Sequence, residues 1–540
     1  MSQQATDDSA DVLIIGAGAS GAAMAWSLAE TKMHIVCLEQ GPLMNPLLYP
    51  SAGRDYEARA NTDFAVSPNV RKLPSDYPIN EKNSPIKVAN FNGVGGGTVL
   101  YAGHFPRFHP SDFRVRSLDG VADDWPIDYQ TLAPFYEENE RMTGVSGLAG
   151  DPAYPPGNAT RTAPLPLGKA GDVLTDGFNA LGWHWWPSDT AIITEDYDGR
   201  AKCINLGACG TGCAQGAKGS TDVTYWPHAQ RAGVELRTRC RVREITVDND
   251  GRATGAVYFD GHGELHQIRA HMVVVACNGV GTPRLLLNSK SEQHPDGLAN
   301  SSGLVGKNLM FHPYALIQGI FERETDGHAG PFKLIRSQEF YETDKSRGFL
   351  RGYTLEIQRG AGPVRMAQTG LRNGRIPWGQ GHHDALRRTF GHSTGMVAVC
   401  EDLPEEHNTV TLDPELTDSN GIPAPKIDYT LSENSQRMLD HAVARATDVL
   451  KAAGANDVWF DSPLSYGGWH LMGTARMGVD PKRSVVNEWG RAHDCENLFV
   501  VDGSIFVTSA GVNPTNTIQA LALYIAEEIK DRLNNATLFD

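Results

Sequence analysis

The sequence has no long apolar run, no low-complexity tract and no internal repeat, and each absence removes a class of protein. A membrane-spanning helix needs about 20 apolar residues in succession, so we expect no membrane insertion. Basic residues are in the minority, since 48 Lys and Arg stand against 64 Asp and Glu and give a net charge of −16. We therefore expect neither nucleic acid nor an anionic membrane surface as a partner.

Several functional signatures are also missing. Residues 1–8 contain no basic segment and no paired arginines, so we expect no signal peptide and a cytoplasmic location. No His-Glu-x-x-His, P-loop or Cys-x-x-Cys-His pattern occurs, which argues against a zinc protease, a P-loop nucleotidase and an attached haem. Of the eight cysteines, five are isolated and are typical of buried thiols.

What is present begins near the N-terminus. A strand-length apolar run over 11–15 leads into Gly16, Gly18 and Gly21, then a helix-forming segment and a second apolar run that ends in Glu39. Gly16 permits the tight turn, Gly18 lets a pyrophosphate approach the backbone, and Gly21 lets helix and strand pack closely. The helix N-terminus faces the phosphates, and the carboxylate suits a ribose diol. The unit predicts a dinucleotide site without identifying the dinucleotide.

The rest of the chain contains segments of two kinds, which predict two different sheets. Another buried strand ends in a glycine turn at 279–283, and a further strand near 497–503 precedes a helix over 518–533, so the chain returns to the first sheet. Between them, alternating segments predict an antiparallel sheet, followed by a helix near 431–453. We expect an α/β fold with a Rossmann-type nucleotide domain built from discontinuous segments and an α+β substrate domain. The predicted boundaries are 1–304 (with a lid or loop region at 42–90 and inserted segments at 105–230), 305–465, and the C-terminal return at 466–540.

Five blocks in this order resemble the glucose–methanol–choline (GMC) family of FAD-dependent alcohol oxidoreductases, over Val12 to about Leu533. The branch that it resembles most contains sugar, gluconate and polyol dehydrogenases. The blocks are the N-terminal Gly-Ala-Gly-Ala-Ser-Gly, Gly93–Gly103, Ala276–Pro283, Gly468–Thr474, and Asp502 with Asn513-Pro514-Thr515.

The resemblance implies non-covalent FAD, because Tyr101 occupies the place where some members attach flavin through a histidine. Ala102 replaces an asparagine found in several members, so contacts near flavin N5 are expected to differ. The residues implied to bind FAD are Gly16, Gly18, Ala19, Ser20, Gly21, Glu39, Gly97, Thr98, Ala102, Val242, Ala276, Asp502, Gly503, Asn513 and Thr515.

The resemblance also implies a catalytic pair. His470 falls at the family's catalytic histidine and Asn513 at its hydrogen-bonding partner. Oxidising a CH–OH group requires loss of the hydroxyl proton and delivery of a hydride to flavin N5, and a histidine is a suitable base near neutral pH. We expect His312 to lie at the edge of the substrate pocket at most. The expected substrate is a small alcohol: a sugar, polyol, glycoside or related hydroxy compound.

One cluster of cysteines leaves alternatives open. Cys203, Cys209 and Cys213 lie in one loop and have the spacing of a [3Fe–4S] site, or they are structural thiols. With a cluster, the chain would be the catalytic subunit of a membrane-associated sugar or polyol dehydrogenase that is exported with a partner. An alternative of another class is a flavin-binding protein without turnover. The electron acceptor (oxygen, a quinone or a redox protein) is left open.

Overall fold

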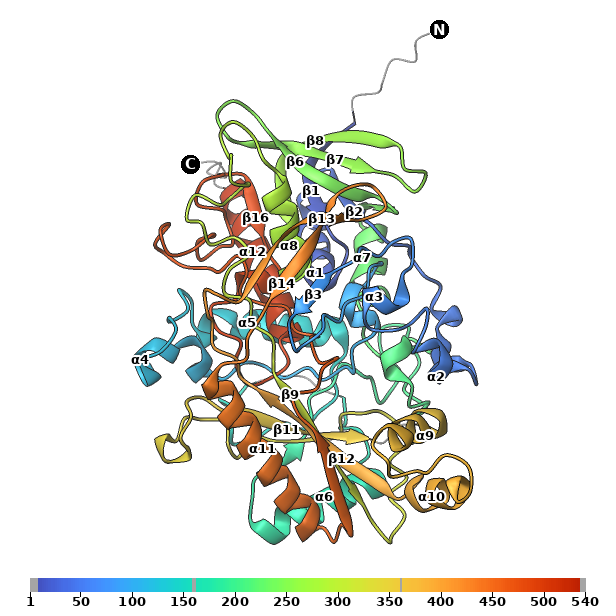
Figure 1. The fold of residues 1–540 in the computed structure, drawn as a ribbon. Coiled ribbons are helices and arrows are strands. Elements are labelled where there is room, and N and C mark those ends of the chain that lie inside the picture. Colours follow the sequence, from blue (N-terminus) through green and yellow to red (C-terminus); the bar gives the residue numbers. More distant parts are fainter. Residues whose placement is uncertain (1–7, 158–161, 360–361, 535–540) are drawn as a thin grey trace.

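The computed structural model of the protein describes residues 8–157, 162–359 and 362–534. Residues 1–7, which carry most of the segment predicted to contain no signal peptide, lie outside the described residues. Two large sheets lie toward opposite ends of the molecule (Figure 1). None of the described helices is both long and apolar enough to cross a membrane.

The first sheet is the predicted nucleotide-binding sheet. Its order is β5-β2-β1-β8-β7-β6, with β16 paired to the C-terminal part of β8. The β1, β2, β5, β8 and β16 pairings are parallel, whereas β6, β7 and β8 pair antiparallel. The strands are β1 (Ser9–Ile15), β2 (Ile35–Glu39), β5 (Glu235–Thr238), β6 (Arg241–Val247), β7 (Ala253–Phe259), β8 (Leu265–Val275) and β16 (Leu498–Val500).

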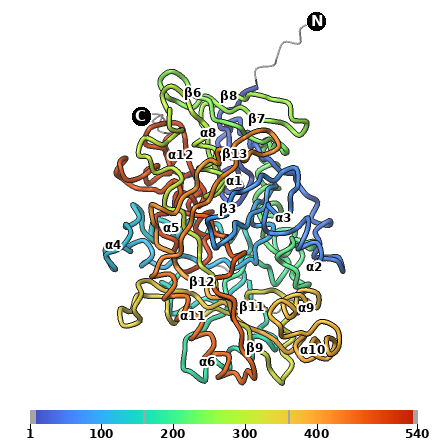
Figure 2. The backbone as a smooth tube through the Cα atoms, in the orientation of Figure 1, coloured from blue at the N-terminus to red at the C-terminus, as the bar shows by residue number. Residues whose placement is uncertain are grey.

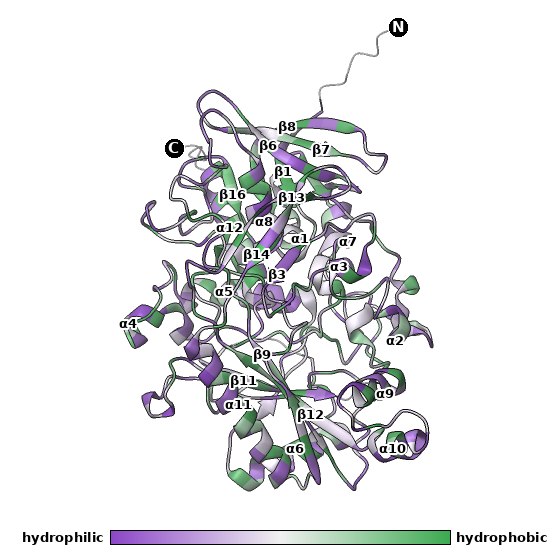
Figure 3. Cartoon of the chain, in the orientation of Figure 1, coloured by the Kyte–Doolittle hydropathy of each residue, from purple (hydrophilic) through white to green (hydrophobic). Residues whose placement is uncertain are grey.

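Helices from both ends of the chain pack beside this sheet. The N-terminal α1 lies against the C-terminal α12, which completes the predicted return of the chain (Figure 2). The apolar side chains of these strands and helices form one core, and hydrophobic colour gathers on them in Figure 3. The helices of this layer are α1 (Ala19–Leu28), α5 (Tyr129–Thr143), α7 (Tyr225–Arg231), α8 (Asn278–Asn288) and α12 (Thr515–Asn534), with the short α4 (Val115–Asp119) nearby.

One local prediction is wrong. The segment 279–283, predicted as a glycine turn before a helix, is the first half of α8. The side-chain oxygen of Asn278 accepts hydrogen bonds from the backbone N–H groups of Val280 and Gly281, at 2.9 and 3.2 Å. This side chain satisfies the open end of the helix, so the helix can begin among glycines.

The second sheet confirms the predicted antiparallel architecture. Its order is β15-β9-β12-β11-β10-β4, and each pairing is antiparallel. One face packs on α6 (Gly168–Leu181) and α11 (Glu433–Ala452), which matches the helix predicted near 431–453. The strands are β4 (Trp186–Pro187), β9 (Tyr314–Ile320), β10 (Ile335–Ser337), β11 (Tyr353–Arg359), β12 (Ser393–Cys400) and β15 (Asp457–Asp461).

Smaller elements surround the space between the two sheets. A three-stranded sheet, in the order β13-β14-β3, ties the early loop region to the second half of the chain. Both α6 and β4 lie within 105–230, the segment predicted to be inserted in the first domain, yet they pack on the second sheet. The remaining elements are β3 (Asn80–Asn83), β13 (Thr409–Thr417), β14 (Pro423–Asp428), α2 (Tyr56–Arg59), α3 (Pro68–Arg71), α9 (Pro363–Arg372) and α10 (His382–Thr389).

Candidate active site

A cavity of about 980 Å³ lies between the two sheets. One end is formed by the carboxyl ends of β1, β2 and β8, and the other by the face of the second sheet that α6 and α11 leave uncovered. Ligand sites in open α/β sheets form at the carboxyl ends of the strands, so this is the expected place for a nucleotide.

The nucleotide end of the cavity is shaped by glycines. A Cβ on Gly16 would lie 2.5 Å from the carbonyl oxygen of Ala276, and one on Gly21 would lie 1.9 Å from the carbonyl oxygen of Gly16. These two glycines therefore permit close packing of strand, turn and helix. Gly18 and Gly97 differ, because a Cβ on either would meet no protein atom closer than 3.8 Å. Both line the cavity, so their missing side chains leave room for a ligand against the backbone.

Two buried carboxylates stand at this end. Glu39 accepts hydrogen bonds from the backbone N–H groups of Ala17 and Gly41, at 2.9 and 2.8 Å. Asp502 accepts from Thr282 Oγ1 at 2.6 Å and from the backbone N–H of Ser504 at 2.8 Å. Burial raises the pKa of both carboxyls, and these hydrogen bonds oppose the shift. The glycine cradle, the N-terminal ends of α1 and α12 and the acid at the end of β2 fit a dinucleotide such as FAD.

The structure brings the predicted site residues together. Each of them except Gly21 lines this cavity, and Gly21 packs behind Gly16. The residues that line it are Gly16, Gly18, Ala19, Ser20, Glu39, Gly97, Thr98, Ala102, Val242, Ala276, His470, Asp502, Gly503, Asn513 and Thr515.

His470 is held by backbone pairing on both sides. Gly468 pairs with Val88, and Met472 pairs with Met310 in an antiparallel bridge. The second bridge brings His312, two residues after Met310, against His470, and their Nδ1 atoms lie 2.6 Å apart. His312 therefore contacts the predicted catalytic histidine directly, whereas the sequence placed it at the pocket edge at most.

Hydrogen-bond partners fix the protons on this histidine pair. His312 Nε2 lies 2.7 Å from the carbonyl oxygen of Ala510, which only accepts, so Nε2 carries the proton. Burial lowers the pKa of His312 to about 4, although the backbone carbonyls oppose the shift, so its Nδ1 is an unprotonated acceptor at neutral pH. His470 must then donate its own Nδ1–H to His312. Its Nε2 is left with the lone pair.

His470 is also held neutral. Burial, and then the adjacent His312, lower the pKa of His470 well below that of an ordinary histidine. The hydroxyl of Tyr314 lies 3.3 Å from Nδ1 and 3.5 Å from Nε2 of the same ring. The arrangement provides an uncharged imidazole with one unprotonated nitrogen at a cavity wall.

A third histidine, His104, is hydrogen-bonded to Asn513. His104 Nδ1 lies 2.8 Å from Asn513 Oδ1 and 2.7 Å from Glu356 Oε1. Since both partners are oxygens, Nδ1 carries the proton and donates to them. Asn513 Oδ1 is thereby engaged, and its amide N–H groups are left to face a ligand. The other oxygen of Glu356 lies 2.8 Å from Lys333 Nζ.

Sequence reasoning missed Glu356, Lys333 and the role of His104. A signal for Glu356 exists, because residues 354, 356 and 358 are polar and alternate with Leu355 and Ile357 on β11. Such alternation indicates a strand with one polar face, here the face toward the cavity. We find no comparable signal for Lys333, which lies outside the regular strands.

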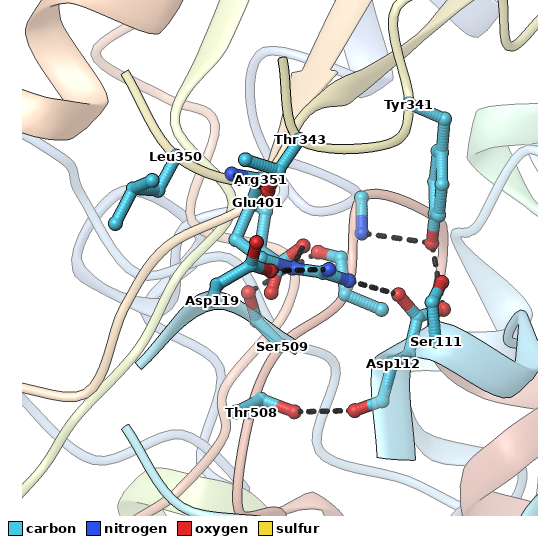
Figure 4. A network of polar contacts seen from close by, with 12 residues as sticks. Ser111, Asp112, Asp119, Tyr341, Thr343, Leu350, Arg351, Glu401, Thr508 and Ser509 are labelled. Atoms are coloured by element: carbon cyan, nitrogen blue, oxygen red, sulfur yellow. Dashed lines mark hydrogen bonds and ion pairs between the residues drawn. The ribbon is translucent and has the colours of Figure 1, made fainter. Parts of the chain in front are cut away.

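The loop that carries the Ala510 carbonyl is supported by a separate buried network (Figure 4). Tyr341 donates its hydroxyl proton to Asp112 Oδ2 at 2.8 Å and accepts from the backbone N–H of Gly511 at 3.1 Å. Thr508 Oγ1 donates to the carbonyl oxygen of Asp112 at 3.0 Å. Arg351 pairs with three carboxylates, those of Asp112, Asp119 and Glu401, at 2.7, 3.0 and 3.0 Å.

The cysteine cluster does not form a metal site in this structure. Among the described residues, no group of three or more His, Cys, Asp or Glu side chains is arranged to hold a metal ion. Burial raises the pKa of Cys203, and it raises that of Cys209 to about 12, so both are protonated thiols at neutral pH. Lys218 lies beside them and donates to the carbonyl oxygens of Val99, Tyr101 and Cys209. The described geometry gives no evidence for an iron–sulfur cluster.

Comparisons with known proteins agree on one family. The models of the GMC oxidoreductase family match residues 10–314 and 404–522. The chain is 42% identical over 538 residues to a 2-methyl-1,2-propanediol dehydrogenase of Mycolicibacterium austroafricanum, covering 98% of this chain and 96% of the relative. It is 28% identical over 543 residues to the fructose dehydrogenase large subunit of Gluconobacter japonicus, covering 97% and 98%.

Solved structures show the same fold. A formate oxidase of Aspergillus oryzae superimposes with a TM-score of 0.66 at 15% identity, covering 98% of this chain and 100% of that one. A pyridoxine 4-oxidase from Mesorbium loti gives a TM-score of 0.63 at 16% identity, covering 96% and 99%.

Proposed function

Since the chain belongs to the GMC oxidoreductase family, a family of flavoenzymes that act on alcohol groups, we propose that it binds FAD non-covalently and oxidises a sugar, polyol, glycoside or related hydroxy compound. In this proposal His470 removes the hydroxyl proton. The relative named for 2-methyl-1,2-propanediol supports a polyol-type substrate.

The neutral state of His470 is the observation that carries the proposal. A base must be unprotonated at the working pH, and burial holds this imidazole neutral. Its Nδ1–H is donated to His312, so the unprotonated Nε2 is the atom that accepts the proton. As the proton moves to Nε2, the Nδ1–H···Nδ1 hydrogen bond keeps the ring in place.

Asn513 orients the reacting hydroxyl. Its Oδ1 is held by His104, so an amide N–H points to the substrate oxygen and stabilises the charge that develops there. FAD, when bound, supplies the hydride acceptor. Non-covalent binding is supported by Tyr101, which stands where a covalent member has a histidine and whose hydroxyl donates to the carbonyl oxygen of Gly219 at 2.9 Å.

Replacing the base tests the proposal. We expect His470→Ala to retain yellow, acid-extractable flavin and to lose about 10²- to 10⁴-fold in the rate of anaerobic flavin bleaching by alcohols. His441→Ala, which removes a histidine from α11 outside the cavity, is the matched control. If His470→Ala bleaches at the wild-type rate, the base is another group. If wild-type flavin is bleached by no alcohol or sugar, the protein binds flavin without this turnover.

A further inference from the structure

The wall of the cavity that faces the nucleotide end carries both polar and apolar side chains. Alternate positions of two strands line it, with Tyr314, Leu316 and Gln318 on β9 and Glu356 and Gln358 on β11. Odd-numbered residues of β9 and β11, such as Ile317 and Leu355, point the other way, into the apolar core beneath α6 and α11. The polar members of this wall need hydrogen-bond partners, because burying an unpaired polar group beside an alkyl chain costs free energy.

Glu356 is the centre of this wall. Its side chain is fully buried, and it contacts His104 Nδ1 through one oxygen and Lys333 Nζ through the other. Lys333 also donates to Gln358 Oε1 at 3.0 Å. Burial alone would raise the pKa of Glu356, but the charges of His104 and Lys333 outweigh it and lower the pKa below its usual range. The wall therefore holds an ionised carboxylate at working pH.

One atom of this cluster has no partner. His104 lines the cavity, its side chain is 1% exposed, and its Nε2 finds no hydrogen-bond partner among the described residues. A buried polar atom left unpaired costs about 1–3 kcal/mol, so such an atom in a cavity wall indicates a ligand group. A hydroxyl both donates and accepts, and it satisfies this nitrogen in either protonation state.

We propose that His104, Glu356 and Lys333 form a subsite for a second hydroxyl, so that the enzyme selects vicinal diols and polyols over mono-alcohols. This inference rests on the proposed function, in which His470 and Asn513 hold the reacting hydroxyl. Because His104 is hydrogen-bonded directly to Asn513, the subsite adjoins the group that holds the reacting hydroxyl in that proposal. In this inference a vicinal diol spans the two.

Matched substrates test the subsite. Propane-1,2-diol and propan-1-ol differ only in the second hydroxyl, and anaerobic flavin bleaching measures the reduction rate divided by the dissociation constant for each. A mono-alcohol leaves the buried His104 Nε2 unpaired, which costs about 1–3 kcal/mol, so we expect wild type to prefer the diol by about 5- to 150-fold. We expect Glu356→Gln, which keeps the shape and removes the charge, to lower this preference at least about fivefold, and Lys333→Met to lower it in the same direction.

A control separates this effect from loss of a buried charge. Glu401 is also a buried carboxylate paired with a cation, but it lies outside the cavity, so Glu401→Gln should leave the preference unchanged. Equal wild-type rates with both alcohols would overturn the subsite and leave the proposed function standing. A full diol preference in Glu356→Gln or Lys333→Met would also overturn it. Flavin that neither these alcohols nor a panel of sugars bleaches would overturn both inferences.

Discussion

This protein contains two buried polar networks that differ in charge balance. In the first, Arg351 forms ion pairs with three carboxylates, those of Asp112, Asp119 and Glu401 (Figure 4). Burial raises the pKa of Asp112 to about 8 and also raises that of Glu401, and Arg351 only partly opposes the shift. In the second network a single carboxylate, Glu356, lies between His104 and Lys333, and its pKa is lowered.

The networks also differ in position. The Arg351 network uses its guanidinium nitrogens on protein partners and does not line the cavity, although Glu401 Oε1 has no hydrogen-bond partner among the described residues. The Glu356 network lines the cavity, and its unpaired atom, His104 Nε2, belongs to a side chain of the cavity wall. A network away from the cavity holds segments of the chain together, whereas an unpaired atom in a cavity wall is available to a ligand.

The largest effect should come from breaking the Arg351 network. Arg351→Met leaves three buried carboxyls without their cation, and we expect the free energy of unfolding to fall by about 3–5 kcal/mol at pH 8. Thermal or urea unfolding measures it. The loss should be smaller at pH 5, because protonated carboxyls need no counter-charge. A melting temperature unchanged at both pH values would show that the network is not structural.

A smaller effect should come from His312, which joins His470 to the loop of the Ala510 carbonyl that the Arg351 network supports. His312→Ala removes the acceptor of the His470 Nδ1 proton, and we expect kcat to fall about 10- to 100-fold with little change in KM.

The pH profile distinguishes positioning from a merely structural role. His470 acts as a neutral base and its pKa is lowered, so in wild type the rate should fall only below about pH 6.5, as the ring gains a proton. Because His312 contributes to that lowering, His312→Ala should move this acid limb to higher pH. His312→Gln, which can restore an acceptor, is the conservative control. If the acid limb of the His312→Ala pH profile does not move, His312 does not lower the pKa of His470.

The smallest effect should come from Tyr341→Phe in the Arg351 network. The variant leaves the backbone N–H of Gly511 without the tyrosine oxygen, so we expect a loss of about 1–3 kcal/mol in unfolding free energy. The preference for diol over mono-alcohol should not change. A changed preference would mean that the two networks are coupled more tightly than their separate hydrogen bonds indicate.

The nucleotide end of the cavity could be predicted from the sequence, because the residues that form it lie close together along the chain. Gly16, Gly18 and Gly21 act through the backbone of one turn, and Glu39 ends the neighbouring strand, so spacing alone specifies the site. His470 and Asn513 were reached only through the family resemblance. Nothing in their immediate sequence distinguishes a catalytic histidine from one in a core.

The residues at the substrate end of the cavity could be identified only from the tertiary structure. His104 and Glu356 are 252 residues apart, and Lys333 lies in an irregular segment, so no spacing rule joins them. The protons on His470 are likewise set by His312, 158 residues away, and by a carbonyl on a third segment. The sequence by itself determined the fold class and the nucleotide cradle, because short-range backbone geometry encodes both. Only the packing of distant segments decided the proton positions on His470 and the polar cluster around Glu356, because both depend on burial and on partners from separate parts of the chain.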